Sequence, residues 1–180
     1  MPAQVRKSGR RGANRAIVGF SLIELLIVVA IILIIAAIAI PNFIRARMAA
    51  NEANAVQACR TIVTASITYG STYGNGYPPT LQTLGGPGSP ANCDAAALLD
   101  QTLTLPPFQK TGYTLSYTMT NANSTPAPSC SVAGGNSFFV TAIPNSVGTT
   151  GQRSFYADET GVLRANPTGG TPTVNDRPIN

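Results

Sequence analysis

One carboxylate stands alone inside a long apolar stretch. Glu24 is the only charged residue in the run from Phe20 to Ile40, FSLIELLIVVAIILIIAAIAI. A carboxylate inside a membrane helix costs about 2.5 to 3.5 kcal/mol on insertion scales, so Glu24 is expected to have a cationic partner. A cut between Gly19 and Phe20 would create an amino-terminal cation close to it. In a parallel stack of such helices, the amine of one subunit could equally meet Glu24 of the next.

The element that must position Glu24 is a helix long enough to cross a bilayer. At about 1.5 Å per residue, the run from Phe20 to Ile40 makes a helix about 32 Å long. The stretch before it is basic, and Lys and Arg next to a span stay on the cytoplasmic side. Residues 43–180 are therefore expected on the opposite side of the membrane, outside the cytoplasm. A secretory signal peptide is the alternative, but the apolar core is too long and Pro41, not a small-residue cleavage site, follows it.

The charge of the chain is concentrated in this leader, residues 1–19. The sequence has a net charge of +5, with 12 basic and 7 acidic residues. Beyond Gly19 the basic and acidic residues are equal in number, so nucleic-acid binding is not expected. The basic residues of the leader are Arg6, Lys7, Arg10, Arg11 and Arg15.

Catalytic and metal-binding chemistry find little support in the residue types. The chain contains no His and no pair of carboxylates in an evident pocket, so we expect neither an enzyme nor a cofactor. Asp158 and Glu159 are adjacent acids that could be read as calcium ligands. At a hairpin turn such residues more often serve the turn itself, so no metal site is predicted.

Beyond the apolar run, the pattern predicts a second helical segment. Pro41 removes a backbone donor and clashes with the preceding turn, so the helix should bend there. From Asn42 to about Thr68 the sequence is rich in Ala and contains no Gly or Pro, so the helix can resume. Apolar residues recur on one side of it, and this stripe is expected to pack on a globular head. The predicted stripe is Ile44, Met48, Val56, Cys59, Val63 and Ile67.

The remaining sequence predicts a small antiparallel sheet. Residues 69–90 read as a loop with at most one short helical turn, and Asn92 to Leu103 as a short helix. Alternation from Tyr113 to Thr120 predicts a strand, and Phe138 to Ile143 a second. RSFYAD and VLRA predict a hairpin around Gly161.

The fold class is thus α+β, with a long bent helix and about four strands. The expected divisions are a leader (1–19), a membrane helix (20–41), a head (42–165) and a loose tail (166–180).

Three cysteines suit a head placed in an oxidising compartment. Cys59 lies on the apolar stripe of the helix and is interpreted as a small buried hydrophobic residue. We therefore predict a disulfide between Cys93 and Cys130, with Cys59 to Cys93 as the alternative pairing.

The segment from Gly19 to Arg47 resembles the prepilin signature of type IV pilins and of type II secretion pseudopilins. The residues that carry the resemblance are Gly19 and the following FSLIELLIVVAIILIIAAIAIPNF. The resemblance implies cleavage after Gly19 by a prepilin peptidase, N-methylation of Phe20, and polymerisation into a filament with these helices at its centre. It also implies that Glu24 sets the register of assembly and that Pro41 bends the helix.

The function expected from this resemblance is that of a structural subunit of a type IV pilus, a homopolymer built by a pilus assembly machinery. The precursor would lie in the bacterial inner membrane and the product on the cell surface. One alternative is a pseudopilin of a type II secretion system, located in a periplasmic pseudopilus. The chain has no Trp and its last cysteine is Cys130, features that do not separate these two. Another alternative is a non-polymerising single-pass membrane protein whose head binds a ligand or DNA.

Overall fold

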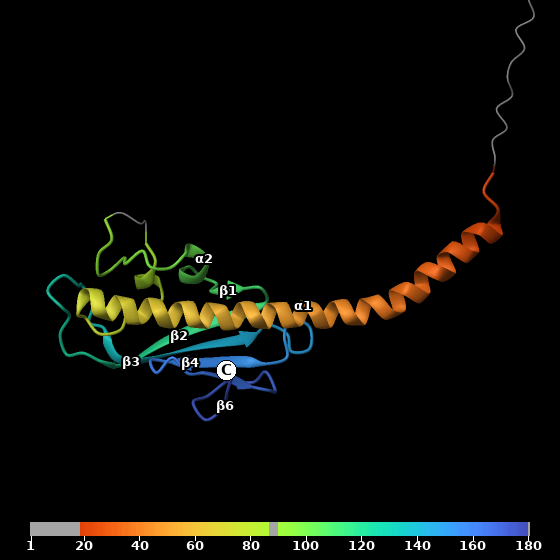
Figure 1. Ribbon diagram of the computed structural model, residues 1–180. Helices are drawn as coiled ribbons and strands as arrows, with labels where there is room; N and C mark the ends of the chain where they lie inside the picture. The colour runs from red at the N-terminus through yellow and green to blue at the C-terminus, as the bar shows by residue number, and fades with distance from the viewer. Residues whose placement is uncertain (1–18, 87–89, 180) are drawn as a thin grey trace, which may run out of the picture. The chain divides into compact units, whose positions relative to one another are not determined.

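The computed structural model describes residues 19–86 and 90–179. The predicted leader lies almost wholly outside these residues. The chain divides into two compact units, one ending at Ile40 and one beginning at Pro41. A single helix, α1 (Leu22–Tyr73), runs through both, as Figure 1 shows. It continues through Pro41 without a break, and the bend predicted there remains a prediction.

The second unit is an α+β fold built on a six-stranded antiparallel sheet (Figure 1). Each strand pairs with its neighbours in sequence, so the spatial order is β1-β2-β3-β4-β5-β6. Such a meander needs no crossover connection, because antiparallel neighbours can be joined directly by turns or loops. The strands are β1 (Gln109–Lys110), β2 (Tyr113–Ala122), β3 (Gly135–Pro144), β4 (Ser154–Asp158), β5 (Leu163–Asn166) and β6 (Arg177–Pro178).

The predicted strands are present, and the sheet is larger than expected. The alternating pattern of β2 buries Tyr113 and Leu115 and exposes Thr114 and Ser116. The predicted hairpin joins β4 to β5, and Gly161 between them has a φ of +75°, which only glycine adopts readily. Two edge strands that the pattern did not predict, β1 and β6, raise the number from about four to six.

The prediction of a loose tail after Ala165 is wrong. Asn166 belongs to β5, and β6 pairs with β5 through Ala165 opposite Arg177. The backbone N–H of Ile179 then donates to the carbonyl of Leu163 at 2.9 Å. The tail is held by backbone hydrogen bonds, which a polar, proline-containing sequence does not reveal.

The predicted short helix from Asn92 to Leu103 is also largely wrong. Only α2 (Gln101–Thr104) is helical there, and Asp100 caps it by accepting from the N–H of Thr102 at 2.8 Å. The preceding amides bond elsewhere, because Ala96 to Leu99 donate to carbonyls around the short 3-10 helix η1 (Gln82–Leu84). That long-range pairing outcompetes the local helical bonds.

The core lies where α1 packs against one face of the sheet. The predicted stripe is partly wrong, since Ile44 and Ile67 are 42% and 47% exposed. The true contact face consists largely of small Ala and Ser side chains, together with Cys59, Ile62, Val63 and Tyr69. The buried residues of α1 are Glu52, Ala55, Ala58, Cys59, Ile62, Val63, Ala65, Ser66 and Tyr69.

Candidate processing, assembly and disulfide sites

The N-terminal unit begins with a capped helix start. Ser21 immediately precedes α1, and its carbonyl accepts from the N–H of Leu25 at 3.2 Å. The Glu24 carboxylate reaches back and accepts from the backbone N–H of Ser21 at 3.1 Å. This is the reciprocal half of a capping box, in which an acid in the first turn satisfies an N–H before the helix. Within one chain, Glu24 therefore stabilises the start of its own helix, where the helix dipole also favours a negative charge.

The two residues at the predicted cleavage position, Gly19 and Phe20, are both exposed. Gly19 is exposed, and a Cβ added there would meet nothing within 4 Å. Phe20 is 76% exposed. Among residues 19–86 and 90–179, no contact therefore requires a small residue at position 19 or an aromatic residue at position 20.

The apolar segment that follows is uncovered along its length. The large apolar side chains from Leu22 to Ile40 are between 45% and 77% exposed. The most apolar window of α1 has a mean hydropathy of 3.3, and none of it is buried. By length and composition, this helix is able to cross a membrane.

In the second unit, a carboxylate fastens α1 to the loop before β4. Glu52 is 8% exposed, and its Oε1 accepts from the backbone N–H groups of Gln152 and Arg153 at 2.9 and 3.1 Å. Its Oε2 accepts from Nε and Nη2 of Arg153 at 2.8 and 2.7 Å. Burial alone would raise the pKa of Glu52, but these amide hydrogen bonds and the guanidinium outweigh it and lower that pKa.

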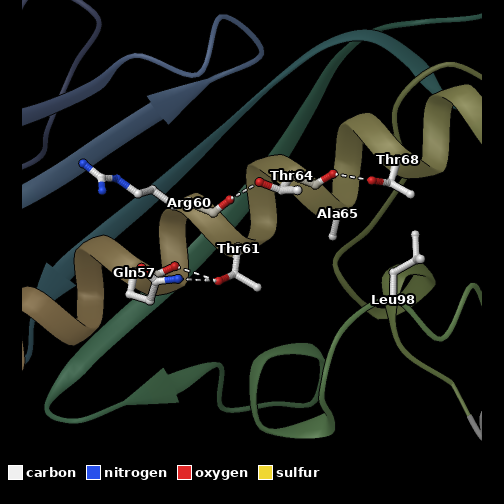
Figure 2. A pocket seen from close by; sticks show the side chains of 7 residues that line it. All are labelled: Gln57, Arg60, Thr61, Thr64, Ala65, Thr68 and Leu98. Atoms are coloured by element: carbon white, nitrogen blue, oxygen red, sulfur yellow. Dashed lines mark hydrogen bonds between the residues drawn. The ribbon is translucent and has the colours of Figure 1, made fainter.

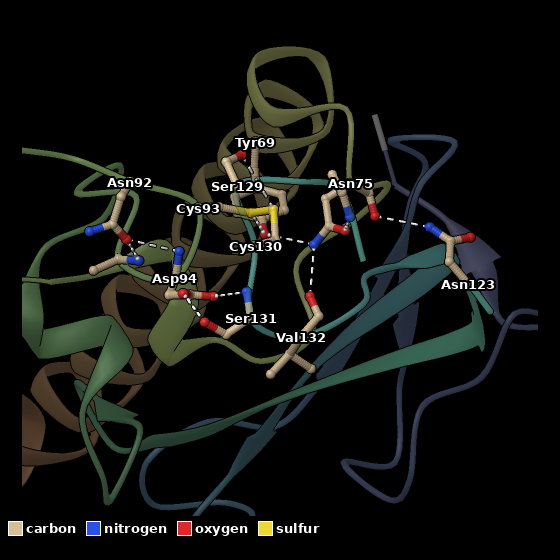
Figure 3. Close-up of a disulfide and its surroundings, with 12 residues drawn as sticks. Tyr69, Asn75, Asn92, Cys93, Asp94, Asn123, Ser129, Cys130, Ser131 and Val132 are labelled. Atoms are coloured by element: carbon tan, nitrogen blue, oxygen red, sulfur yellow. Dashed lines mark hydrogen bonds between the residues drawn. A yellow bond between two sulfur atoms is a disulfide. The ribbon is translucent and has the colours of Figure 1, made fainter. Parts of the chain in front are cut away.

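The predicted disulfide joins Cys93 to Cys130, and Figure 3 shows its surroundings. The bond closes a sequence separation of 37 residues. Cys59 is a free, buried thiol, as expected from its place on the helix, and desolvation raises its pKa to about 12. Of the two pairings considered from the sequence, the structure contains Cys93 with Cys130.

Asn75 connects the end of α1 to the segment that carries Cys130 (Figure 3). It is 1% exposed, and its Nδ2 donates to the carbonyl of Val132 at 2.9 Å and to the hydroxyl of Tyr69 at 3.2 Å. Its Oδ1 accepts from the N–H of Ala127 at 3.0 Å. One buried amide therefore fixes both the position of the loop and the orientation of the Tyr69 hydroxyl.

A shallow groove of about 370 Å³ lies between the exposed side of α1 and Leu98 (Figure 2). The hydroxyls of Thr61, Thr64 and Thr68 point back and donate to carbonyls four residues earlier, at 2.8, 3.0 and 2.9 Å. They are thereby satisfied within the helix. Arg60 is the only charged residue in the lining. The groove has no nucleophile with a base beside it, so its surface suits packing more than chemistry.

Asp158 and Glu159 serve the β4–β5 turn and its surroundings. Asp158 Oδ1 accepts from the N–H of Thr160 at 3.1 Å, and Glu159 Oε2 accepts from the N–H of Phe138 at 3.3 Å. Their carboxylates therefore satisfy backbone donors, as turn chemistry predicts.

Sequence reasoning missed Glu52 and Asn75. Glu52 is not in the predicted stripe, although it lies seven residues before Cys59 and so shares its helix face. That spacing was the available signal. Asn75 offered none, since apart from Tyr69 its hydrogen-bond partners are Asn123, Ala127 and Val132, which lie far away in the sequence.

Three comparisons with known proteins, against family models, curated proteins and solved structures, each returned no match to this chain.

Proposed function

We propose that this chain is the structural subunit of a type IV pilus. It is made as a precursor in the bacterial inner membrane, with the head outside the cytoplasm. A prepilin peptidase cleaves it after Gly19, the new amine of Phe20 is methylated, and the pilus assembly machinery polymerises it through the N-terminal helix.

The observation that carries this proposal is the uncovered apolar surface of α1, joined without a break to a folded head. A simple membrane anchor also has such a surface, and Glu24 would cap its helix as well, but in an anchor nothing would offset the cost of placing a charged group in the membrane beyond that one capping bond. Glu24 is exposed, and one of its oxygens accepts one hydrogen bond from Ser21. A carboxylate accepts up to about four hydrogen bonds, so Glu24 can still accept hydrogen bonds from the amine of a neighbouring subunit.

The exposed Gly19 supports the processing step of the proposal. The fold has no need of glycine at that position, because a Cβ there meets nothing within 4 Å. A small residue at this site is explained instead by recognition by a second protein, the peptidase that must fit the chain into its active site.

The test separates the charge of Glu24 from its capping bond. Glu24→Gln keeps a hydrogen-bond acceptor for the Ser21 N–H, since Gln also serves in a capping box, but it removes the charge. Glu24→Val removes both. Leu25→Val is the matched control, because it places Val in the same turn and retains the carboxylate. Each variant is expressed at the wild-type level, and sheared surface filaments are compared with total membrane-bound protein.

We expect Glu24→Gln and Glu24→Val to insert normally and to lose nearly all filaments, while Leu25→Val assembles like wild type. An unpaired amine buried in an apolar bundle is far costlier than one in water, so the loss falls on assembly. Filaments at the wild-type level in Glu24→Gln would contradict the register role. A secretion defect without surface filaments would indicate the pseudopilin alternative. A permanently membrane-bound monomer would exclude both and favour a single-pass protein with a binding head.

A further inference from the structure

The two sulfurs of the disulfide occupy different environments. Cys93 is 1% exposed and belongs to the core of the second unit. Cys130 is only partly buried, and its sequence neighbours Ser129 and Ser131 are exposed. A thiolate that attacks a disulfide must reach one sulfur in line with the bond, and access decides which sulfur it is. The attack is therefore directed to Cys130.

The hydroxyl of Tyr69 lies 3.0 Å from the Sγ of Cys93 (Figure 3). A disulfide sulfur carries no hydrogen, so the hydroxyl is the donor in this contact. Asn75 Nδ2 donates to the same hydroxyl oxygen at 3.2 Å and so occupies an acceptor position, which leaves the Tyr69 proton directed to the sulfur. Burial raises the pKa of Tyr69, which keeps that proton in place.

A second contact holds the two cysteine segments together independently of the sulfur bond. Asp94 Oδ1 accepts from the N–H of Ser131 at 3.0 Å, and its Oδ2 accepts from the Ser131 hydroxyl at 2.6 Å. These residues directly follow Cys93 and Cys130. We call this pair of hydrogen bonds between Asp94 and Ser131 the latch. When the disulfide is open, the latch keeps the two sulfurs close, so their reaction stays effectively intramolecular.

We propose that Cys130 is the site at which a thiol–disulfide oxidoreductase engages this protein, and that Tyr69 is a positioning residue that stabilises the sulfur of Cys93. During oxidation, the Cys130 thiolate attacks the partner's disulfide, forming a mixed disulfide and releasing one partner thiolate. The Cys93 thiolate, accepting the Tyr69 hydrogen bond, then attacks Cys130 Sγ. The Cys93–Cys130 bond forms, and the second partner sulfur leaves with the electron pair. The partner is thereby reduced by two electrons.

The same path runs in reverse during reduction. An external thiolate bonds to Cys130 Sγ, the Cys93–Cys130 bond breaks, and Cys93 leaves as a thiolate that then takes a proton from solvent. A hydrogen bond to an anionic leaving group strengthens as its charge develops. Tyr69 therefore accelerates bond breaking, the direction in which charge develops on the Cys93 sulfur.

The experiment uses the full chain in non-ionic detergent and 2-mercaptoethanol as a neutral probe. The disulfide is reduced briefly, the reaction is quenched with acid, and free thiols are alkylated after denaturation. Peptide mapping is expected to find the mercaptoethanol adduct on Cys130 and the alkyl group on Cys93. The adduct on Cys93, or equally on both residues, would overturn the assignment. A parallel sample is alkylated without denaturation, and there Cys59, which is 0% exposed, reports unfolding, because it reacts only if the head opens.

Tyr69→Phe tests the positioning role. We expect the initial rate of reduction to fall roughly tenfold, which is the loss of one hydrogen bond to a charged group. Tyr73→Phe is the matched control, since its ring lies against Tyr69 with centroids 5.1 Å apart, and its rate is expected to stay at the wild-type value. A purely structural role predicts the opposite sign, because a loosened head exposes the bond and speeds reduction. An unchanged or faster rate in Tyr69→Phe would therefore refute the role of Tyr69.

Discussion

The contact between Glu52 and the loop before β4 yields a prediction about the stability of the head. Glu52→Ala removes the acceptor of two backbone N–H groups and of the Arg153 guanidinium. A hydrogen bond to a charged group contributes about 1.5 to 3 kcal/mol, and a donor left buried without a partner costs a similar amount. Because some of these donors regain water, we expect the free energy of unfolding to fall by about 3 kcal/mol.

The two partners of this contact should contribute unequally. The Arg153 side chain is 46% exposed, against 11% for Glu52, so solvent screens its charge. Arg153→Ala also leaves Glu52 with both backbone amides. We therefore expect Arg153→Ala to lower the free energy of unfolding by less than about 1 kcal/mol. Gln57→Ala, at an exposed position of α1, is the control for a change on the helix surface and should be near neutral.

The assay is urea unfolding of the full chain in non-ionic detergent, followed by near-ultraviolet circular dichroism. The chain has six Tyr and no Trp, and all six tyrosines lie from Tyr69 onward, so the signal reports the head alone. Equal losses in Glu52→Ala and Arg153→Ala would refute the reasoning. They would mean that the side-chain ion pair, and not the capture of the loop amides, provides the stability.

The pH dependence follows from the lowered pKa of Glu52. A carboxylate whose pKa is lower in the folded state stabilises the fold above its unfolded pKa and loses that effect as the pH falls through the folded value. The difference in unfolding free energy between wild type and Glu52→Ala should thus be constant near neutrality. Below about pH 4 it should shrink. A difference that grows on acidification would contradict the assigned direction.

Two further predictions concern the disulfide and the processing site. Replacing both Cys93 and Cys130 by Ala should lower the free energy of unfolding by roughly 4 kcal/mol, the chain-entropy value for a loop of 37 residues, and the same urea titration measures it. No change would show that the latch from Asp94 alone suffices to order this loop. Gly19→Leu should leave the head as stable as wild type, because the position is open, but should block cleavage. Intact-mass analysis of membrane protein tests this, and normal processing of Gly19→Leu would argue against recognition of a small residue.

The sequence by itself determined the elements that depend on local pattern. The alternation of Tyr113 and Leu115 with Thr114 and Ser116 located β2, because a strand with one buried face has a period of two. Gly161 located the β4–β5 turn, because a positive φ favours glycine. The long helix followed from continuous apolar and Ala-rich sequence. Its last turn, from Tyr69 to Tyr73, lies past the predicted end near Thr68 and contains Gly70 but no Ala, so the packing of the buried Tyr69 side chain holds it and not helix propensity.

The Cys93–Cys130 pairing also followed from the sequence, because Cys59 could be assigned to the apolar face of the helix. Cys59 lies on the packed side of a helix, where a sulfur is surrounded by apolar atoms, and the structure leaves it as a buried free thiol. Two cysteines then remained for one bond. The different exposure of their sulfurs and the Tyr69 hydroxyl beside Cys93 could not be predicted, since they depend on packing between segments far apart in the chain.

Tertiary structure decided everything that rests on long-range backbone hydrogen bonds. The segment from Arg177 to Ile179 is short and contains proline, yet it pairs with β5 because that edge offers unpaired carbonyl and N–H groups. The amides from Ala96 to Leu99 likewise bond to carbonyls near η1 in place of forming a helix. Glu52 is buried because two amides of a distant loop need an acceptor at that point. Such partners are set by the assembled fold, since each buried backbone donor must find an acceptor wherever the folded chain provides one.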